Sequence, residues 1–217
     1  MPDCGLLIFD LDGTLFQTHA VSLPAVQEVF RSFDLPVPPA EKILSFFGRP
    51  GTEWQPWLRS QCPPERADAL VAAVDRREME MIAERGQLYP GAREALEALR
   101  EMVAQMAICT NGPHDYVETV LQSQSVAAFF DVVRYRRPDD QGKPQMVAEL
   151  LERVVARPAL VIGDRWDDII AAHENGLRAI GAGYGYGSLE ELGEADALAH
   201  EIGELPRLVG EMLGRET

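Results

Sequence analysis

The second half of the chain alternates between short apolar runs and longer amphipathic stretches. The apolar runs predict buried strands at residues 106–110, 131–134, 159–163, 178–180 and 196–199. The stretches around them predict helices at residues 91–103, 113–123, 144–155, 166–175 and 201–213. Together with an apolar run at residues 5–9, this alternation indicates a parallel α/β sheet that helices cover on both faces.

Residues 20–87 follow a different pattern, in which apolar positions recur at helical spacing and no convincing strand is found. Helices are predicted around residues 23–30, 43–47 and 54–58, and a long helix follows Pro63-Pro64 and ends near Gly86. We therefore expect an α/β core formed by residues 1–15 and 88–217, with a smaller all-helical domain at residues 16–87 inserted after the first strand.

The composition is that of an ordinary folded protein, with 46% hydrophobic and 25% charged residues among 217. The formal net charge of -15 argues against nucleic acid or an anionic membrane as a partner, because both attract basic surfaces. A small anionic substrate fits this charge only where local cations or a metal ion reverse the field.

Cysteine usage and the N-terminal segment bear on the compartment. Cys4, Cys62 and Cys109 are far apart and form no CxxC pair, which fits a reducing environment and argues against a disulfide framework. No basic segment precedes an apolar core at the N-terminus, and no apolar run approaches about 18 residues. We therefore expect a cytoplasmic protein with neither a signal peptide nor a membrane span.

The first apolar run leads directly into Asp10-Leu11-Asp12-Gly13-Thr14. Residues two apart on an extended chain point the same way, so Asp10 and Asp12 place two carboxylates side by side at the end of a buried strand. Such a pair repels itself and loses hydration unless a cation, hydrogen bonds or a shared proton compensates. We interpret the pair as a catalytic dyad with a hard metal ion; the alternative is an ordinary turn, where Asp and Gly are common.

Polar residues also follow two other predicted strands, and the carboxyl ends of parallel strands share the edge of the sheet where ligands bind. Thr110-Asn111-Gly112 offers a hydroxyl and backbone N–H groups to a phosphate, or else serves as a helix cap. Asp164 and Asp168 lie four residues apart at a predicted helix start and are candidate Mg²⁺ ligands. The alternative is that acidic residues simply favour helix N-termini.

Two cations are candidates for contact with an anionic substrate. Lys143 lies in Gly142-Lys143-Pro144 before a predicted helix and can reach a phosphoryl oxygen, unless it is a solvated surface lysine. Arg49 lies in a glycine-containing loop of the helical segment. It can close over the site and select the leaving group, or it lies in an exposed turn between helices.

These residues, in this order, resemble the motifs of the haloacid dehalogenase superfamily of phosphohydrolases. The matching positions are Asp10-Leu11-Asp12-Gly13-Thr14, Thr110, Lys143 and Gly163-Asp164-x-x-x-Asp168, and the resemblance covers nearly the whole chain. Residues 89–91 and 185–192 are similar to the phosphoglycolate phosphatase-like branch. That branch implies a Rossmann-like parallel-sheet core and a helical cap domain between the first two motifs, where residues 16–87 lie.

The resemblance also implies an activity: Mg²⁺-dependent hydrolysis of a small phosphorylated metabolite through an aspartyl-phosphate. Asp10 would be the nucleophile, and Asp12 would protonate the leaving oxygen and then deprotonate the attacking water. Dehalogenases of the superfamily attack carbon and lack an acid at the second position. The presence of Asp12 therefore favours phosphate ester chemistry.

The remaining roles concern the metal ion and the phosphoryl group. The resemblance implies that Mg²⁺ binds Asp10, the carbonyl oxygen of Asp12 and Asp164, with Asp168 bound through water or orienting the other ligands. The phosphoryl oxygens would be held by Thr110, the N–H groups of Asn111 and Gly112, and Lys143.

Two other functions stay open at this point. A phosphosugar mutase of the β-phosphoglucomutase type would use the same scaffold, with the cap holding a bisphosphate in two orientations. A non-catalytic binding protein could keep the fold, but it would not need both Asp10 and Asp12. The sequence names neither the leaving group nor the oligomeric state, monomer or homodimer, and it gives no function for residues 134–141.

Overall fold

A parallel sheet forms the centre of the molecule in the computed structural model, which describes residues 5–49 and 51–214. Its strands have the order β3-β2-β1-β4-β5-β6. Their bounds are β1 (Leu6–Phe9), β2 (Gln105–Thr110), β3 (Val132–Tyr135), β4 (Ala159–Gly163), β5 (Arg178–Ala182) and β6 (Ala197–Ala199). Leu6 is paired with Gln105 on one side and with Ala159 on the other. The predicted parallel sheet is confirmed, and the carboxyl end of β1 lies between those of β2 and β4.

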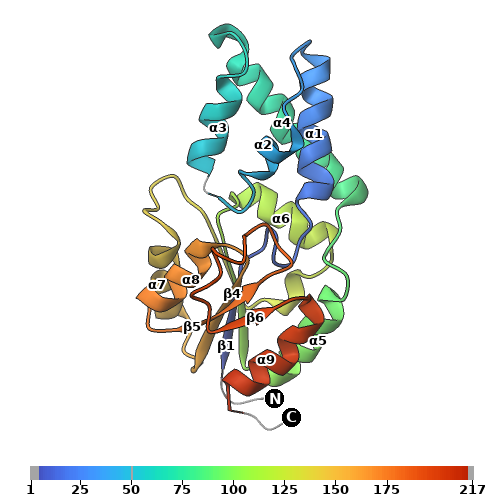
Figure 1. Cartoon of the computed structure of the whole chain (residues 1–217). Helices are drawn as coiled ribbons and strands as arrows, with labels where there is room; N and C mark the ends of the chain where they lie inside the picture. The colour runs from blue at the N-terminus through green and yellow to red at the C-terminus, as the bar shows by residue number, and fades with distance from the viewer. Residues whose placement is uncertain (1–4, 50, 215–217) are drawn as a thin grey trace.

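Helices cover both faces of the sheet, as Figure 1 shows. Leu7 and Phe9 of β1 face an apolar cluster that includes residues of α5 (Ala92–Met102), α6 (His114–Ser123) and α9 (Leu205–Met212). Leu6 and Ile8 face a second cluster that includes residues of α7 (Lys143–Arg153) and α8 (Trp166–Glu174). The central strands β1 and β4 are buried along their whole length, which explains why they carry no polar side chains.

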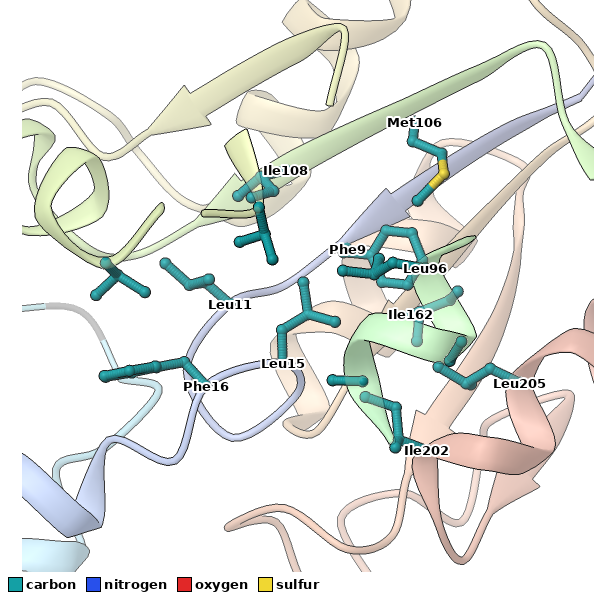
Figure 2. Packing of buried hydrophobic residues seen from close by; sticks show 14 of the residues in the cluster. Phe9, Leu11, Leu15, Phe16, Leu96, Met106, Ile108, Ile162, Ile202 and Leu205 are labelled. Atoms are coloured by element: carbon teal, nitrogen blue, oxygen red, sulfur yellow. The ribbon is translucent and has the colours of Figure 1, made fainter. Parts of the chain in front are cut away.

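Apolar side chains anchor the loop that follows β1. Leu11, Leu15 and Phe16 are each at most 1% exposed and belong to the same cluster as Phe9. Figure 2 shows them continuing the packing of the strand beyond its end. Because these side chains are fixed in the core, the polar residues between them are held in defined positions at the edge of the sheet.

Among the described residues between β1 and α5, four helices form what is called the helical insertion: α1 (His19–Ser32), α2 (Ala40–Leu44), α3 (Gly51–Arg59) and α4 (Pro64–Arg85). They extend from the carboxyl edge of the sheet (Figure 1) and share an apolar cluster that includes Phe30, Ile43 and Leu70. Phe16 and Leu88 form an antiparallel bridge. The chain therefore leaves the sheet and returns to it at adjacent points.

The structure differs from the sequence predictions at a few element ends. The second predicted helix, at residues 43–47, ends at Leu44, and Phe46 and Phe47 follow it in a turn. Phe46 packs against Trp54 and Trp57 there, so a turn buries apolar residues at the spacing expected of a helix. The last predicted helix, at 201–213, begins with a separate 3-10 turn at Ile202–Glu204, and another 3-10 turn at Ala127–Phe129 was not predicted.

Within residues 5–49 and 51–214, no helix is long and apolar enough to cross a membrane. Cys62 and Cys109 are free thiols, whereas Cys4 lies outside the described residues.

Candidate active site

Three strand ends deliver polar side chains to one place. Asp10 directly follows β1, Thr110 is the last residue of β2, and Asp164 directly follows β4. Each is at most 2% exposed. Because β2 and β4 flank β1 in the sheet, these side chains meet at its carboxyl edge, and the predicted convergence is confirmed.

Asp10, Asp164 and Asp168 form a buried cluster in which one carboxylate oxygen of each lies within 4.8 Å of the others. Burial raises the pKa of Asp10 to about 7 and that of Asp164 to about 8, and it also raises the pKa of Asp168. Asp164 Oδ1 is buried and has no hydrogen-bond partner among the described residues. Unpaired buried carboxylate oxygens are costly, so this cluster fits a hard cation such as Mg²⁺, which prefers oxygen ligands.

Lys143 begins α7 and is buried beside this cluster, so it is not a solvated surface lysine. Its Nζ donates to Asp10 Oδ1 at 2.7 Å and to Asp168 Oδ1 at 2.5 Å. Burial by itself would lower the pKa of Lys143, but the charges of Asp10 and Asp168 outweigh this effect and raise the pKa well above its usual value. The ammonium group is therefore a fixed positive charge next to Asp10.

Asp12 has different partners from Asp10. Thr18 Oγ1 donates to Asp12 Oδ1 at 2.5 Å, and the Tyr116 hydroxyl donates to the same oxygen. Burial raises the pKa of Asp12, and these two hydrogen bonds lower it only in part. Burial and the charge of Asp12 raise the pKa of Tyr116 well above its usual value, so its hydroxyl remains a donor. One acid thus contacts an ammonium group and the other contacts hydroxyls.

Glycines allow the backbone to pack closely around Asp164. A Cβ on Gly13, whose φ is +85°, would lie 2.2 Å from Asp164 Oδ2, and a Cβ on Gly187 would lie 1.9 Å from the Asp164 carbonyl oxygen. Tyr186 N donates to Asp164 Oδ2 at 2.7 Å from the same loop. This approach requires residues without side chains, which accounts for glycine at both positions.

The turn Thr110-Asn111-Gly112 joins β2 to α6. Thr110 Oγ1 accepts a hydrogen bond from the N–H of Gly112 at 3.1 Å. Asn111 Nδ2 donates to the carbonyl oxygen of Gly48 at 3.0 Å and to Asp167 Oδ2 at 2.9 Å. The Asn111 side chain therefore links the core to the helical insertion.

A cavity of about 130 Å³ lies beside Asp10 and Asp12, between the edge of the sheet and the helical insertion. Arg49 lines this cavity, and its side chain is 41% exposed and 3.8 Å from Glu53. Arg49 thus borders the cavity from an exposed turn between α2 and α3, and its contact with a substrate stays a prediction. The other lining residues are Thr18, Phe46, Phe47, Gly48, Trp54, Glu78, Thr110, Asn111, Gly112, Pro113 and Tyr116.

Glu78 and Tyr116 were not predicted as site residues. Glu78 of α4 accepts a hydrogen bond from Ser22, and burial raises its pKa to about 7. Neither residue belongs to a motif, and each lies on the apolar face of its helix. Glu78 shares that face of α4 with Met81, and Tyr116 shares that face of α6 with Val120. A polar group within an apolar stripe is the one sequence signal that could have identified them.

Residues 134–141, which had no assigned role, order the loop that leads to Lys143. The buried Arg134 guanidinium contacts Asp140 at 2.6 Å and Glu149 at 2.9 Å. Arg136 donates from the same segment to Asn111 Oδ1 at 3.0 Å. This segment therefore connects the turn after β2 with the start of α7.

Comparison with known proteins gives a consistent result. A family model of haloacid dehalogenase-like hydrolases matches residues 5–176. The chain is 30% identical over 193 residues to the phosphoglycolate phosphatase of Mannheimia succiniciproducens, covering 83% of this chain and 86% of that protein. It is 29% identical over 220 residues to the phosphoglycolate phosphatase of Vibrio parahaemolyticus, covering 95% and 96%.

Solved structures agree in fold. A predicted phosphatase from Clostridium acetobutylicum matches with a TM-score of 0.79 and 25% identity, over 96% of this chain and 99% of that chain. A predicted phosphoglycolate phosphatase from Haemophilus somnus matches with a TM-score of 0.84 and 21% identity, over 94% and 97%. At the latter identity the likeness concerns the fold alone.

Proposed function

The chain belongs to the haloacid dehalogenase-like hydrolases and is a phosphatase, and from this premise we propose that it hydrolyses small phosphate monoesters with Mg²⁺ through an aspartyl-phosphate. The observation that carries the proposal is the different surroundings of the two neighbouring acids. Asp10 contacts the Lys143 ammonium group, and Asp12 accepts hydrogen bonds from two hydroxyls. The names of the relatives make 2-phosphoglycolate the first substrate we propose.

The two acids divide the proposed reaction between them. A carboxylate oxygen of Asp10 forms a bond to phosphorus, the ester P–O bond breaks, and Asp12 gives its proton to the departing oxygen. Asp12, now ionised, takes a proton from a water molecule whose oxygen attacks the phosphorus of the aspartyl-phosphate, and the bond between phosphorus and the Asp10 oxygen breaks. Inorganic phosphate leaves, and both acids return to their starting protonation states.

Other residues would hold the phosphoryl group and the metal ion. Lys143, Thr110 and the backbone N–H groups that follow Thr110 would bind phosphoryl oxygens. Asp10, Asp164 and the carbonyl oxygen of Asp12 would hold Mg²⁺, which supplies positive charge to the phosphoryl oxygens when bound.

Asp168 would act on the metal site through other groups. Its Oδ1 accepts from Lys143, and its Oδ2 accepts from the N–H of Arg165 at 3.0 Å. Both carboxylate oxygens of Asp168 therefore already have partners. This favours a role in which Asp168 orients Lys143 or binds Mg²⁺ through a water molecule, and not one in which it ligates the metal directly.

We propose that residues 16–87 act as a cap domain over the core formed by residues 1–15 and 88–217. Support comes from the cavity between the helical insertion and the edge of the sheet, and from the adjacent crossing points at Phe16 and Leu88. In this proposal Arg49 contacts the leaving group, and the cap excludes water during phosphoryl transfer.

Phosphate release from p-nitrophenyl phosphate and from 2-phosphoglycolate tests the function. We expect both esters to be hydrolysed with Mg²⁺ and neither at a comparable rate when the metal is chelated. Turnover that is indifferent to chelation would contradict the proposal, as would absence of turnover on both esters. Conversion of β-glucose 1-phosphate to the 6-phosphate, without phosphate release, would indicate the mutase instead.

A further inference from the structure

The carboxyl group of Asp12 is held at one oxygen only. Thr18 Oγ1 and the Tyr116 hydroxyl both donate to Oδ1, and no residue in the described part of the chain donates to Oδ2. A carboxylate oxygen has two lone-pair positions, so an oxygen that accepts two O–H bonds has no room for a proton of its own. While both hydroxyls donate to Oδ1, a proton on Asp12 is therefore on Oδ2.

The two donors come from different parts of the molecule. Thr18 directly precedes α1 of the helical insertion. Tyr116 is in the first turn of α6 in the core, and a Cβ on Gly112 would lie 3.1 Å from its ring. The Tyr116 ring therefore packs directly on the turn after β2 that we propose as the phosphoryl-binding turn. Its hydroxyl fixes Asp12 relative to that turn.

We propose that Tyr116 is a positioning residue for acid–base catalysis by Asp12, an inference that rests on the proposed function. Its hydroxyl, together with that of Thr18, keeps Oδ1 as an acceptor and presents Oδ2 as the oxygen that gives a proton to the leaving group and later takes one from water. Tyr116 touches neither the reacting phosphorus nor the metal in this account.

A positioning role for Tyr116 predicts a difference between substrates that a purely structural role would not produce. Protonation matters most for a strongly basic leaving group such as an alkoxide, and least for p-nitrophenolate, which is a stable anion. Misplacing the acid should therefore slow the hydrolysis of an alkyl phosphate more than that of p-nitrophenyl phosphate. A general loss of folding or of phosphoryl binding would slow both reactions by the same factor.

The test compares Tyr116→Phe with the wild type on 2-phosphoglycolate and p-nitrophenyl phosphate. Phe keeps the ring against Gly112 and removes only the hydroxyl. We expect kcat for the alkyl ester to fall about 10-fold or more and KM to change little. The expected loss is part of the roughly 10²–10⁴-fold rate increase that acid–base catalysis contributes. For p-nitrophenyl phosphate we expect a fall of about 3-fold or less.

Two further variants make the result specific. Thr18→Val removes the other donor at nearly constant shape, and it should change the ratio of the two rates in the same direction. Tyr184→Phe is the matched control, because it removes a hydroxyl that donates to the carbonyl oxygen of Thr14 at 3.0 Å and does not contact Asp12. That control should leave the ratio unchanged.

The outcomes separate this inference from the proposed function. Equal losses on both esters in Tyr116→Phe, or no loss on either, would overturn the positioning role while wild-type turnover stands. Absence of wild-type turnover on both esters would overturn the proposed function and this inference with it. Should Tyr116→Phe not fold, an unchanged ratio in Thr18→Val overturns the inference.

Discussion

At the scale of single residues, the site depends on two carboxylates that are neighbours in sequence and differ in their partners. Asp10 lies 2.7 Å from the Lys143 ammonium group, and Asp12 accepts from the hydroxyls of Thr18 and Tyr116. Identical side chains two positions apart thereby acquire different chemistry. In our account Asp10 must be ionised when it attacks phosphorus, while Asp12 must carry a proton at that moment.

Replacement of Asp12 tests this division of roles. Asp12→Asn keeps an oxygen that accepts from Thr18 and Tyr116, and it keeps the backbone carbonyl proposed as a metal ligand. We expect turnover to fall by about 10²–10⁴-fold, with the affinity for Mg²⁺ largely retained. Steady-state kinetics and a Mg²⁺ titration followed by thermal unfolding measure the two effects. Nearly full activity, or loss of Mg²⁺ binding, would show that the assignment is wrong.

The motif residues could be identified from the sequence because Asp10, Thr110 and Asp164 lie at strand ends and Lys143 lies at a helix start. Their partners could not. Tyr116 reaches Asp12 across more than a hundred positions, and only the packing of α6 against the sheet brings the two together. The burial of Lys143 could not be predicted either, because its local sequence is also typical of a surface loop.

At the scale of elements, the hydrophobic pattern was sufficient for most of the fold. Apolar runs predicted the strands because a parallel strand buried on both faces has no polar positions. The turn that contains Phe46 and Phe47 has the apolar spacing of a helix, because Phe47 is buried and Phe46 packs on Trp54 and Trp57, so the pattern predicts a helix there. The order of the strands was not predicted, since it depends on which side of β1 each crossover passes.

Helix α4 carries a titratable group that should affect stability. Burial raises the pKa of Glu78 to about 7 from 4.5, and the Ser22 hydrogen bond offsets this only in part. Between these pH values the folded state holds a proton that the unfolded state has lost, so the free energy of unfolding should fall as pH rises. Glu78→Gln lacks this effect. Its stability relative to the wild type should therefore be higher at about pH 8 than at about pH 5.

Urea unfolding of both proteins in metal-free buffer at the two pH values measures this effect. Glu80→Gln serves as the control, because Glu80 is an exposed residue of the same helix. A stability difference between Glu78→Gln and the wild type that is the same at both pH values would contradict the prediction.

The segment that leads into α7 should depend on a buried ion pair. Arg134 and Asp140 have side chains only 3% and 5% exposed and lie 2.6 Å apart. Arg134→Met leaves the Asp140 carboxylate without its cation, and we expect a loss of about 3–5 kcal/mol in the free energy of unfolding. Arg137→Ala removes an exposed cation 3.8 Å from Glu149 and should cost less than about 1 kcal/mol. Equal effects of the two variants in urea unfolding would be incompatible with this account.

At the scale of the whole molecule, a protein of net charge -15 is proposed to bind an anionic substrate. The buried cluster alone carries three carboxylates against the one ammonium group of Lys143. A divalent cation would cancel the remaining negative charge of this cluster where the phosphoryl group binds. The net charge of the chain and the negative charge of the cluster thus both favour metal binding before substrate binding.

Metal binding should therefore stabilise the whole fold. At about 100 times its Kd, Mg²⁺ should add about 2.7 kcal/mol to the stability, which corresponds to roughly 5–10 °C in Tm for a chain of this length. Asp164→Asn should abolish most of this shift, and Asp167→Asn, one position from the cluster, should retain it. Added NaCl should weaken Mg²⁺ binding because it screens the negative field. A Tm that does not respond to Mg²⁺ would contradict the metal site.

The central claim is that Asp10 carries the phosphoryl group during turnover. The most direct measurement mixes the protein with Mg²⁺ and a radiolabelled phosphate ester, quenches the reaction in acid and locates the label on the protein by peptide mapping. We predict label on the peptide that contains Asp10, released by hydroxylamine as expected of an acyl phosphate, and none in Asp10→Asn, which should be inactive. Label on a different residue, or turnover by Asp10→Asn, would contradict the account.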